Sequence, residues 1–177
     1  MQFFCYHRDR VGSTPLRAEM VEQHWAYMDR FDAAMAARGP TFADDDTLTG
    51  SVHVVDLPDP VAARAFAFDE PCYQAGAYRD VMIRRTRWRR LDASGGDGFL
   101  VLGFTARPEP YDDLPVPRSD LIGFGPLLSD DGTRLLGAAA LVPGPDAAAA
   151  WSLLDADPAA GRFAGVEVQR WQHGGRC

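Results

Sequence analysis

His24 carries the side chain in this 177-residue sequence that is best suited to proton transfer. An imidazole titrates close to neutral pH and can therefore both accept and donate a proton. With a carboxylate that fixes its tautomer and stabilises its charged form, it could abstract a proton, tautomerise or eliminate on a phenolic or enolic ring. That chemistry requires no metal ion and no acyl intermediate, and we expect neither a metal nor a cofactor. The alternative is structural, a half-buried histidine bonded to a backbone carbonyl.

The pattern around His24 predicts a long helix that begins at Thr14 and Pro15 and ends at Gly39-Pro40. Apolar residues and His24 recur at spacings of three and four, so they share one face, which we expect to turn toward the core. Charged residues such as Arg17 are expected mostly on the other faces. The predicted core face consists of Leu16, Met20, His24, Tyr27, Phe31 and Met35.

The other elements of the first half are predicted to be strands and one more helix. The acidic run Asp44-Asp45-Asp46 is typical of a solvated hairpin, and Pro58-Asp59-Pro60 precedes an Ala-rich helix. The resulting order, βαββαβ, predicts a ferredoxin-like α+β unit with helices on one face of an antiparallel sheet. The predicted strands are 2–7, a short one opened by Gly39-Pro40, 51–57 and 78–87, and the helix is 60–69.

Two segments of the first half return in the second half. RGPTFADDDT at 38–47 returns as FGPLLSDDGT at 124–133, and LPDP at 57–60 returns as VPGP at 142–145. The offset of about 86 residues (124 minus 38) is too long for a solenoid repeat, so each copy should be a small domain. We predict a tandem duplication with domains at 1–90 and 98–177 and a linker at 91–98.

The second copy lacks the segment that corresponds to the His24 helix. Between its first two predicted strands lie Pro108, Pro110, Pro115 and Pro117, and prolines exclude a helix of several turns. We therefore expect one candidate active site per chain. The predicted elements of this copy are strands at 99–105, 121–128, 135–142 and 165–171 and a helix at 146–154.

Three motifs in this order resemble the YciI-like (YCII-related) proteins over nearly all of residues 1–88. They are a first strand ending in Asp9 before the His24 helix, Gly39-Pro40 with its acidic hairpin, and Glu70-Pro71 followed by Ala75-Gly76-Ala77-Tyr78. Residues 98–177 look like a degenerate second copy, in which Asp157-Pro158 and Gly161 echo Glu70-Pro71 and Gly76.

The resemblance implies a dimeric α+β barrel, in which two ferredoxin-like units pair their sheets and a small-molecule cleft lies between sheet and helices. In a tandem chain the pairing would give an intramolecular pseudo-dimer, with a homodimer as the alternative. The family has a proposed His-Asp active site, and one branch resembles dehydrochlorinating lyases of chlorinated hydroxyquinone breakdown.

Carried over by position, the histidine of that site is His24, and its acidic partner is Asp9 or Glu70. Glu70 stands where the family usually has Asp. We take Asp69, Tyr27 and Arg38 as candidate substrate-binding residues and expect the ligand to be a small organic molecule.

Composition excludes several other classes of function. The chain has 18 basic and 25 acidic residues and a net charge of −7, so we expect no nucleic-acid partner, and the arginines between 84 and 90 are interpreted as a solvated strand end. No apolar run approaches the roughly 18 residues of a membrane span, and the start does not resemble a signal peptide, so we expect a cytoplasmic protein. Cys5, Cys72 and Cys177 lack paired spacing and are predicted to be free thiols.

The remaining motifs are weak. The histidines have no zinc-site spacing, the acidic hairpin lacks a calcium-loop pattern, and Gly123-Phe124-Gly125 is not followed by a helix, as a nucleotide fingerprint would be. Two function hypotheses stay open. The first is a small acid/base enzyme of the lyase or isomerase type, and the second is a non-catalytic ligand-binding or dimerisation module with a regulatory or pathway-accessory role.

Overall fold

The computed structural model describes residues 1–91, 96–115, 121–155 and 162–174, which form two compact units. The first unit consists of residues 1–83 with Gly174, and the second of Arg84–His173. The predicted Asp157-Pro158 and Gly161 motif, half of the predicted linker (92–95), Pro117 and Cys177 lie outside the described residues. No helix in the described part of the chain is long and apolar enough to cross a membrane.

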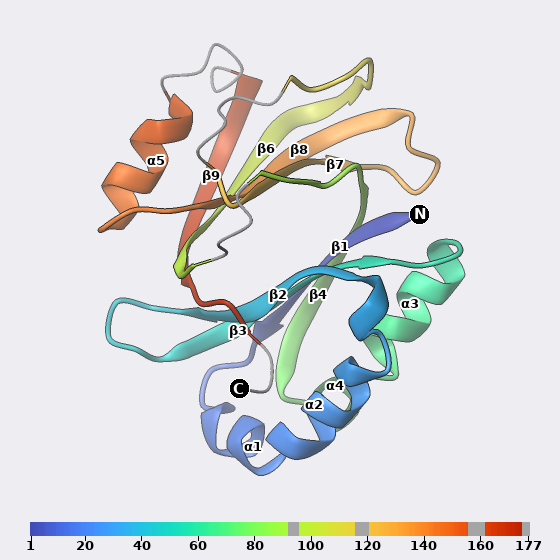
Figure 1. Cartoon of the computed structure of the whole chain (residues 1–177), viewed down its shortest axis with the longest axis vertical. Helices are drawn as coiled ribbons and strands as arrows, with labels where there is room; N and C mark the ends of the chain where they lie inside the picture. Colours follow the sequence, from blue (N-terminus) through green and yellow to red (C-terminus); the bar gives the residue numbers. More distant parts are fainter. Residues whose placement is uncertain (92–95, 116–120, 156–161, 175–177) are drawn as a thin grey trace. The chain divides into compact units, whose positions relative to one another are not determined.

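The first unit is an α+β sandwich with its helices on one side of a sheet (Figure 1). Its strands lie in the order β4-β1-β3-β2, and both β1 and β2 pair with β3 in antiparallel fashion. This order is compatible with a ferredoxin-like fold. The strands are β1 (Gln2–Asp9), β2 (Met35–Phe42), β3 (Leu48–Asp56) and β4 (Tyr78–Thr86), and the helices are α1 (Thr14–Glu19), α2 (Val21–Asp29), a 3-10 turn (Asp32–Ala34), α3 (Pro60–Phe68) and α4 (Pro71–Gln74).

Acidic side chains and prolines fix where α3 and α4 begin. Asp59 Oδ1 accepts a hydrogen bond of 2.8 Å from the Ala62 amide, and Pro60 occupies the first turn. Glu70 Oε2 accepts one of 2.8 Å from the Tyr73 amide in the same way, with Pro71 next to it. The predicted helix at 60–69 is confirmed as α3.

The long helix predicted from Thr14 to Gly39 is wrong in its second half. The chain breaks at Met20 into α1 and α2, α2 ends at Asp29, and Met35 already pairs with Val55 as the first residue of β2. Phe31, at the end of the helical region, packs edge-on against Phe66, with ring centroids 4.9 Å apart. Strand pairing and aromatic packing therefore override the helical spacing of the sequence, and Gly39-Pro40 lies inside β2.

The break at Met20 also corrects the placement of Arg17. The spacing put Arg17 on an outer face of one continuous helix, but α1 is a separate short helix and Arg17 is buried, with 8% of its side chain exposed. Arg17 therefore faces the sheet rather than solvent.

The apolar core of the first unit lies between the helices and the inner face of the sheet. Strand residues of β1 and β3 meet helix residues of α2 and α3 there, and the cluster includes Phe3, Cys5, Met28, Val55, Ala63 and Phe66. Cys5 and Cys72 are buried free thiols, as predicted.

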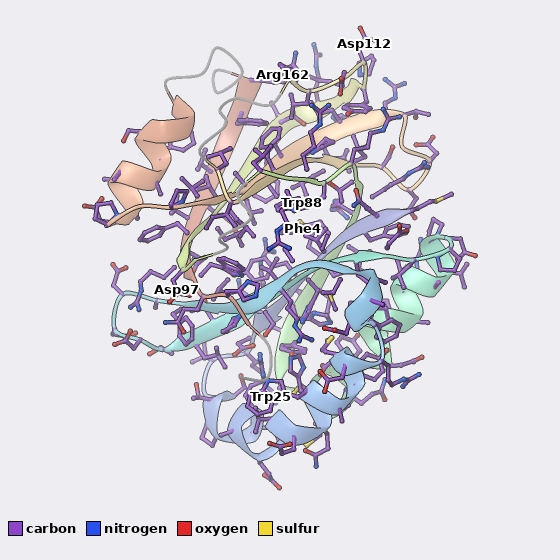
Figure 2. The ribbon with its side chains drawn as sticks, viewed as in Figure 1. Phe4, Trp25, Trp88, Asp97, Asp112 and Arg162 are labelled. Carbon is purple, nitrogen blue, oxygen red and sulfur yellow. The ribbon has the colours of Figure 1, made fainter. Side chains whose placement is uncertain are left out.

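The second unit is a five-stranded sheet with one described helix, and its strand order is β9-β6-β8-β7-β5. Between β6 and β7 the described residues 111–115 contain no helix. Its core includes Phe99, Leu128 and Leu135, and Asp112 and Arg162 lie at its surface (Figure 2). The elements are β5 (Arg89–Arg90), β6 (Gly98–Pro110), β7 (Gly123–Leu128), β8 (Arg134–Val142), α5 (Ala147–Asp155) and β9 (Phe163–Trp171).

Gly50 allows β1 and β3 to approach closely. A Cβ there would overlap the His7 carbonyl oxygen and lie 2.7 Å from Tyr6 Cε2. We expect Gly50→Ala to lower the free energy of unfolding by about 2 kcal/mol, measured by urea denaturation, because overpacking a strand pair costs this much. The control is Gly165→Ala, where nothing lies within 4 Å of the added methyl group. Equal stability of the two variants would contradict the close approach.

Candidate active site

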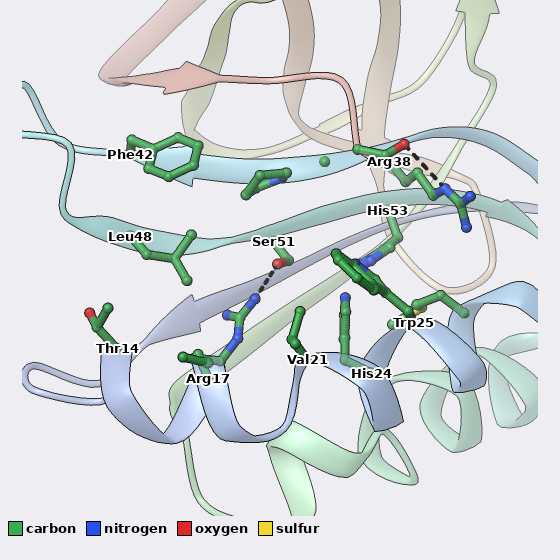
Figure 3. A pocket seen from close by; sticks show the side chains of 15 residues that line it. Thr14, Arg17, Val21, His24, Trp25, Arg38, Phe42, Leu48, Ser51 and His53 are labelled. Carbon is green, nitrogen blue, oxygen red and sulfur yellow. Dashed lines mark hydrogen bonds between the residues drawn. The ribbon is translucent and has the colours of Figure 1, made fainter. Parts of the chain in front are cut away.

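A cavity of about 270 Å³ opens between helices α1 and α2 and strands β2 and β3 of the first unit (Figure 3). The strand register explains its polar side. Arg38 lies opposite His53 and Pro40 opposite Ser51, so these residues share the face of the sheet that the helices cover. Val21, Trp25, Phe42 and Leu48 supply much of the apolar lining, and the polar lining includes Arg17, His24, Arg38, Ser51 and His53.

His24 is bonded to Glu70 at the edge of this cavity. His24 Nδ1 lies 2.7 Å from Glu70 Oε1, and the two side chains are 11% and 0% exposed. Burial acts to raise the pKa of Glu70, but the hydrogen bond and charge of His24 outweigh it and hold that pKa below its ordinary value. Glu70 is therefore ionised at neutral pH and can only accept, so Nδ1 is the nitrogen that donates.

That hydrogen bond fixes the other nitrogen of His24 as the reactive one. With its proton on Nδ1, a neutral imidazole has a lone pair on Nε2. No other described residue forms a hydrogen bond with the ring. Figure 3 shows the ring rising from α2 toward the strand that carries His53. His24 can thus act as a base toward a molecule in the cavity, and Glu70 stabilises the imidazolium that results.

Asp9, the other carboxylate considered for His24, is paired with Arg17. Arg17 Nη1 donates to Asp9 Oδ1 at 2.5 Å, and Arg17 Nη2 donates to Ser51 Oγ at 2.8 Å. Burial raises the pKa of Asp9 to about 6, and the opposing charge of Arg17 only partly compensates for it. Of the two carboxylates, the structure brings Glu70 and not Asp9 to His24.

The three candidate substrate-binding residues are in different places. Arg38 lines the cavity, where its Nε donates to the Gly174 carbonyl at 3.3 Å and its other nitrogens lie 3.6 Å and 3.4 Å from Asp29 and Asp32 carboxylates. Tyr27 donates to the Phe66 carbonyl at 3.1 Å and lies outside the cavity lining. Asp69 is exposed at the end of α3, also outside the lining.

Two further histidines, which the sequence left unassigned, pack beside His24. His53 lies in the lining, with its ring centroid 5.8 Å from that of His24 and 5.6 Å from that of His7. His7 Nε2 lies 2.9 Å from the Ala67 carbonyl, to which it donates. The signal that could have found them is the two-residue period, which places His7 and His53 on the same inward face as Cys5 and Val55.

One group of potential metal ligands exists among the described residues. The ligand atoms of His24, Glu70 and Cys72 all lie within 4.8 Å of one another. Burial raises the pKa of the Cys72 thiol to about 12, and the charge of Glu70 adds to this rise, so the thiol is protonated at neutral pH. A soft metal ion would have to displace both that proton and the proton that His24 shares with Glu70. These three residues therefore fit a protonated, hydrogen-bonded cluster better than a metal site.

Comparison with known proteins shows which family and which solved structure the first unit is similar to. The model of the YCII-related domain matches residues 1–89. Among solved structures, 5-chloro-2-hydroxyhydroquinone dehydrochlorinase from Burkholderia phenoliruptrix AC1100, in complex with 2,5-dihydroxybenzoquinone, is 28% identical over 48% of this chain and 92% of that chain, with a TM-score of 0.45. The comparison with curated proteins found no match.

The buried groups of the site give stability a defined pH dependence. Burial lowers the pKa of His7 to about 4 and that of His53 well below 6.5. Above pH 6.5 neither state protonates these rings. Below pH 6.5 these two rings bind protons in the unfolded chain but not in the folded chain, so the stability falls as the pH falls toward 4. Asp9, with its raised pKa, acts in the opposite sense between pH 3.8 and about 6.

Because two histidines lower the stability as the pH falls and one carboxyl group raises it, we expect a net loss of stability toward acid pH. We expect the free energy of unfolding, from urea denaturation, to fall by roughly 2 kcal/mol between pH 7 and pH 5. Asp9→Asn removes the opposing group and should steepen the fall, whereas His53→Leu should reduce it. A pH-independent wild type, or two variants with unchanged slopes, would show that these groups titrate normally.

Proposed function

The chain belongs to the YCII-related family, and we propose that its first unit is a small-molecule acid/base enzyme of the lyase or isomerase type, with His24 as the proton-transfer residue and Glu70 as its partner. The observation that carries this proposal is the buried 2.7 Å hydrogen bond between His24 Nδ1 and Glu70 Oε1, with the opposite side of the imidazole at a cavity. Buried histidine-carboxylate pairs at cavities are a recurring arrangement for general acid/base catalysis.

The reaction begins when one proton leaves the ligand. His24 Nε2 takes a proton from an acidic C–H or O–H group, and the electron pair left on the ligand delocalises into its ring or enol system. Glu70 stabilises the imidazolium through the Nδ1–H bond. Return of the proton at another atom of the ligand completes an isomerisation. In an elimination, the electron pair of the broken bond to hydrogen forms the new double bond, the leaving group departs from the adjacent carbon with its bonding pair, and His24 passes the proton to the leaving group or to water.

The cavity sets limits on the ligand. Its volume of about 270 Å³ is at the lower end of small-molecule sites and suits a single ring with a few substituents. Trp25, Val21 and Phe42 offer apolar surface to a flat ring (Figure 3). Arg17 and Arg38 are already paired with carboxylates, so the site favours a phenolic or enolic ring that enters neutral. Arg38 is the proposed ligand contact among the three substrate-binding candidates.

A ligand-binding module without catalysis is the second candidate. The observation in its favour is that both arginines in the described lining of the cavity are paired, so the described lining offers no unpaired cation to a developing negative charge. In that case the His24–Glu70 pair would only hold a ligand hydroxyl group.

We also propose that the two units are copies of one ancestor and that the second has lost its site. In chain order, β1 to β4 of the first unit form the order 4-1-3-2, and β6 to β9 of the second form the same order, with β5 added. The hairpins also agree. Asp45 Oδ1 and Asp131 Oδ1 each accept a 3.0 Å bond from the amide two residues later, and Asp46 and Gly132 both have positive φ.

The exchange of carbon-bound hydrogen tests the proposed activity. A panel of single-ring phenols, hydroxyquinones and cyclic enols is incubated with the protein in D₂O, and loss of C–H signals is followed by NMR. We expect at least one compound to exchange at least about 100-fold faster with the wild type than with His24→Gln, the usual contribution of a general base. Saturable binding without exchange would favour the binding module. If no compound of the panel either binds or exchanges, the proposed site is refuted.

The two carboxylates can be separated with the compound that this panel identifies. In Glu70→Gln the amide oxygen still caps α4, but its NH₂ group donates to His24 Nδ1 and moves the imidazole proton to Nε2, which removes the base. We expect kcat/KM to fall by about 10²- to 10⁴-fold. Asp9→Asn is the matched control, and its kcat/KM should change by less than about tenfold because Asp9 contacts Arg17. Equal losses of kcat/KM in the two variants would show that Asp9 also takes part in the reaction.

A further inference from the structure

His53 is a buried imidazole without a hydrogen bond. Only 2% of its surface is exposed, its Nδ1 is enclosed without a partner, and no described residue bonds to either ring nitrogen. Buried polar side chains are nearly always hydrogen-bonded, and leaving one without a partner costs stability. An apolar residue of similar size would pack the same space without that cost, so His53 calls for a functional explanation.

The neighbours of His53 account for its position but not for its polarity. Its ring lies 5.8 Å from the Phe66 ring and 5.8 Å from the His24 ring, centroid to centroid, and 5.6 Å from His7. Burial, reinforced by the nearby charges that His7, His24 and Arg17 can carry, keeps the imidazole neutral at neutral pH. A neutral imidazole offers one N–H donor and one lone-pair acceptor, and no residue in the described part of the chain bonds to either.

His7 provides the comparison within the same unit. It is equally buried and sits on the same face of the sheet, but its Nε2 donates to the Ala67 carbonyl at the end of α3. His7 is not part of the cavity lining, whereas His53 is. One histidine therefore supports the fold, and the other faces the space that a ligand would fill.

We propose that His53 is a ligand-binding residue of this cavity, whose neutral imidazole hydrogen-bonds an oxygen of the ligand and so orients it toward His24. The inference rests on the proposed function of the same site. Because a proton on His24 further disfavours one on His53, His53 keeps its neutral form while His24 takes up and releases the proton. In this proposal His24 transfers the proton and His53 binds the ligand.

The first test needs no ligand. His53→Leu removes an unsatisfied polar group and should raise the melting temperature by roughly 4 °C, whereas His7→Leu, the same substitution one strand away, leaves the Ala67 carbonyl without its donor and should lower it. A fall in His53→Leu as large as that in His7→Leu would show that His53 is structural and would overturn the inference.

The second test measures binding of 4-nitrophenol through the change in its absorption. We expect His53→Leu to raise the Kd about tenfold, the effect of one lost hydrogen bond. An unchanged Kd in His53→Leu, with tight binding to the wild type, would overturn the role of His53 alone. Absence of binding to the wild type would instead refute the phenolic ligand class of the proposed function and remove the basis of this inference with it.

Discussion

The hydrogen bond between His24 and Glu70 is the interaction on which the first unit and its site both depend. Glu70 is fully buried, and a buried carboxylate without partners costs several kcal/mol. Its two oxygens are both occupied, Oε2 by the amide that starts α4 and Oε1 by His24. The same carboxylate therefore fixes a helix, ties α2 to it and selects the tautomer of the imidazole, so that stability and reactivity are not separable at this residue.

Titratable side chains are buried between the sheet and the helices, and their partners decide which of them keep a charge. Glu70 and Arg17 keep their charges because each has a close opposite partner or donor. His7 and His53 are held neutral, because burial is the largest influence on both imidazoles and neither has a carboxylate as a hydrogen-bond partner. Of the three neighbouring histidines, His24 alone has a carboxylate on one side and the cavity on the other. The contrast among three adjacent histidines comes from their partners and not from their depth, since all three are at least nine-tenths buried.

The sequence predicts the parts of this unit that local chemistry decides. Asp59 with Pro60 marks the start of α3, and the β-branched residues of the predicted strand 51–57 mark most of β3. It also places His24 toward the interior. It fails where distant contacts decide: Phe31 and Met35 follow the helical spacing but join aromatic packing and strand pairing. Choosing Glu70 over Asp9 as the partner of His24 was equally out of reach, because 46 residues separate His24 from Glu70 along the chain and only the folded register brings them together.

With the two proposed copies matched, the strand register puts apolar residues of the second unit where the first unit has the polar side of its cavity. If Gly39-Pro40 is matched to Gly125-Pro126, the strand pairing puts Ala138 where Ser51 stands, because Pro40 lies opposite Ser51 and Pro126 opposite Ala138. Two residues further along β8, Ala140 takes the place of His53, and Phe124 that of Arg38. All three replacements belong to the buried apolar cluster of the second unit. These apolar side chains carry no polar group that would need a buried partner such as Glu70. Under the proposed duplication, the histidine helix and its polar partners would be lost together, since neither could remain buried without the other.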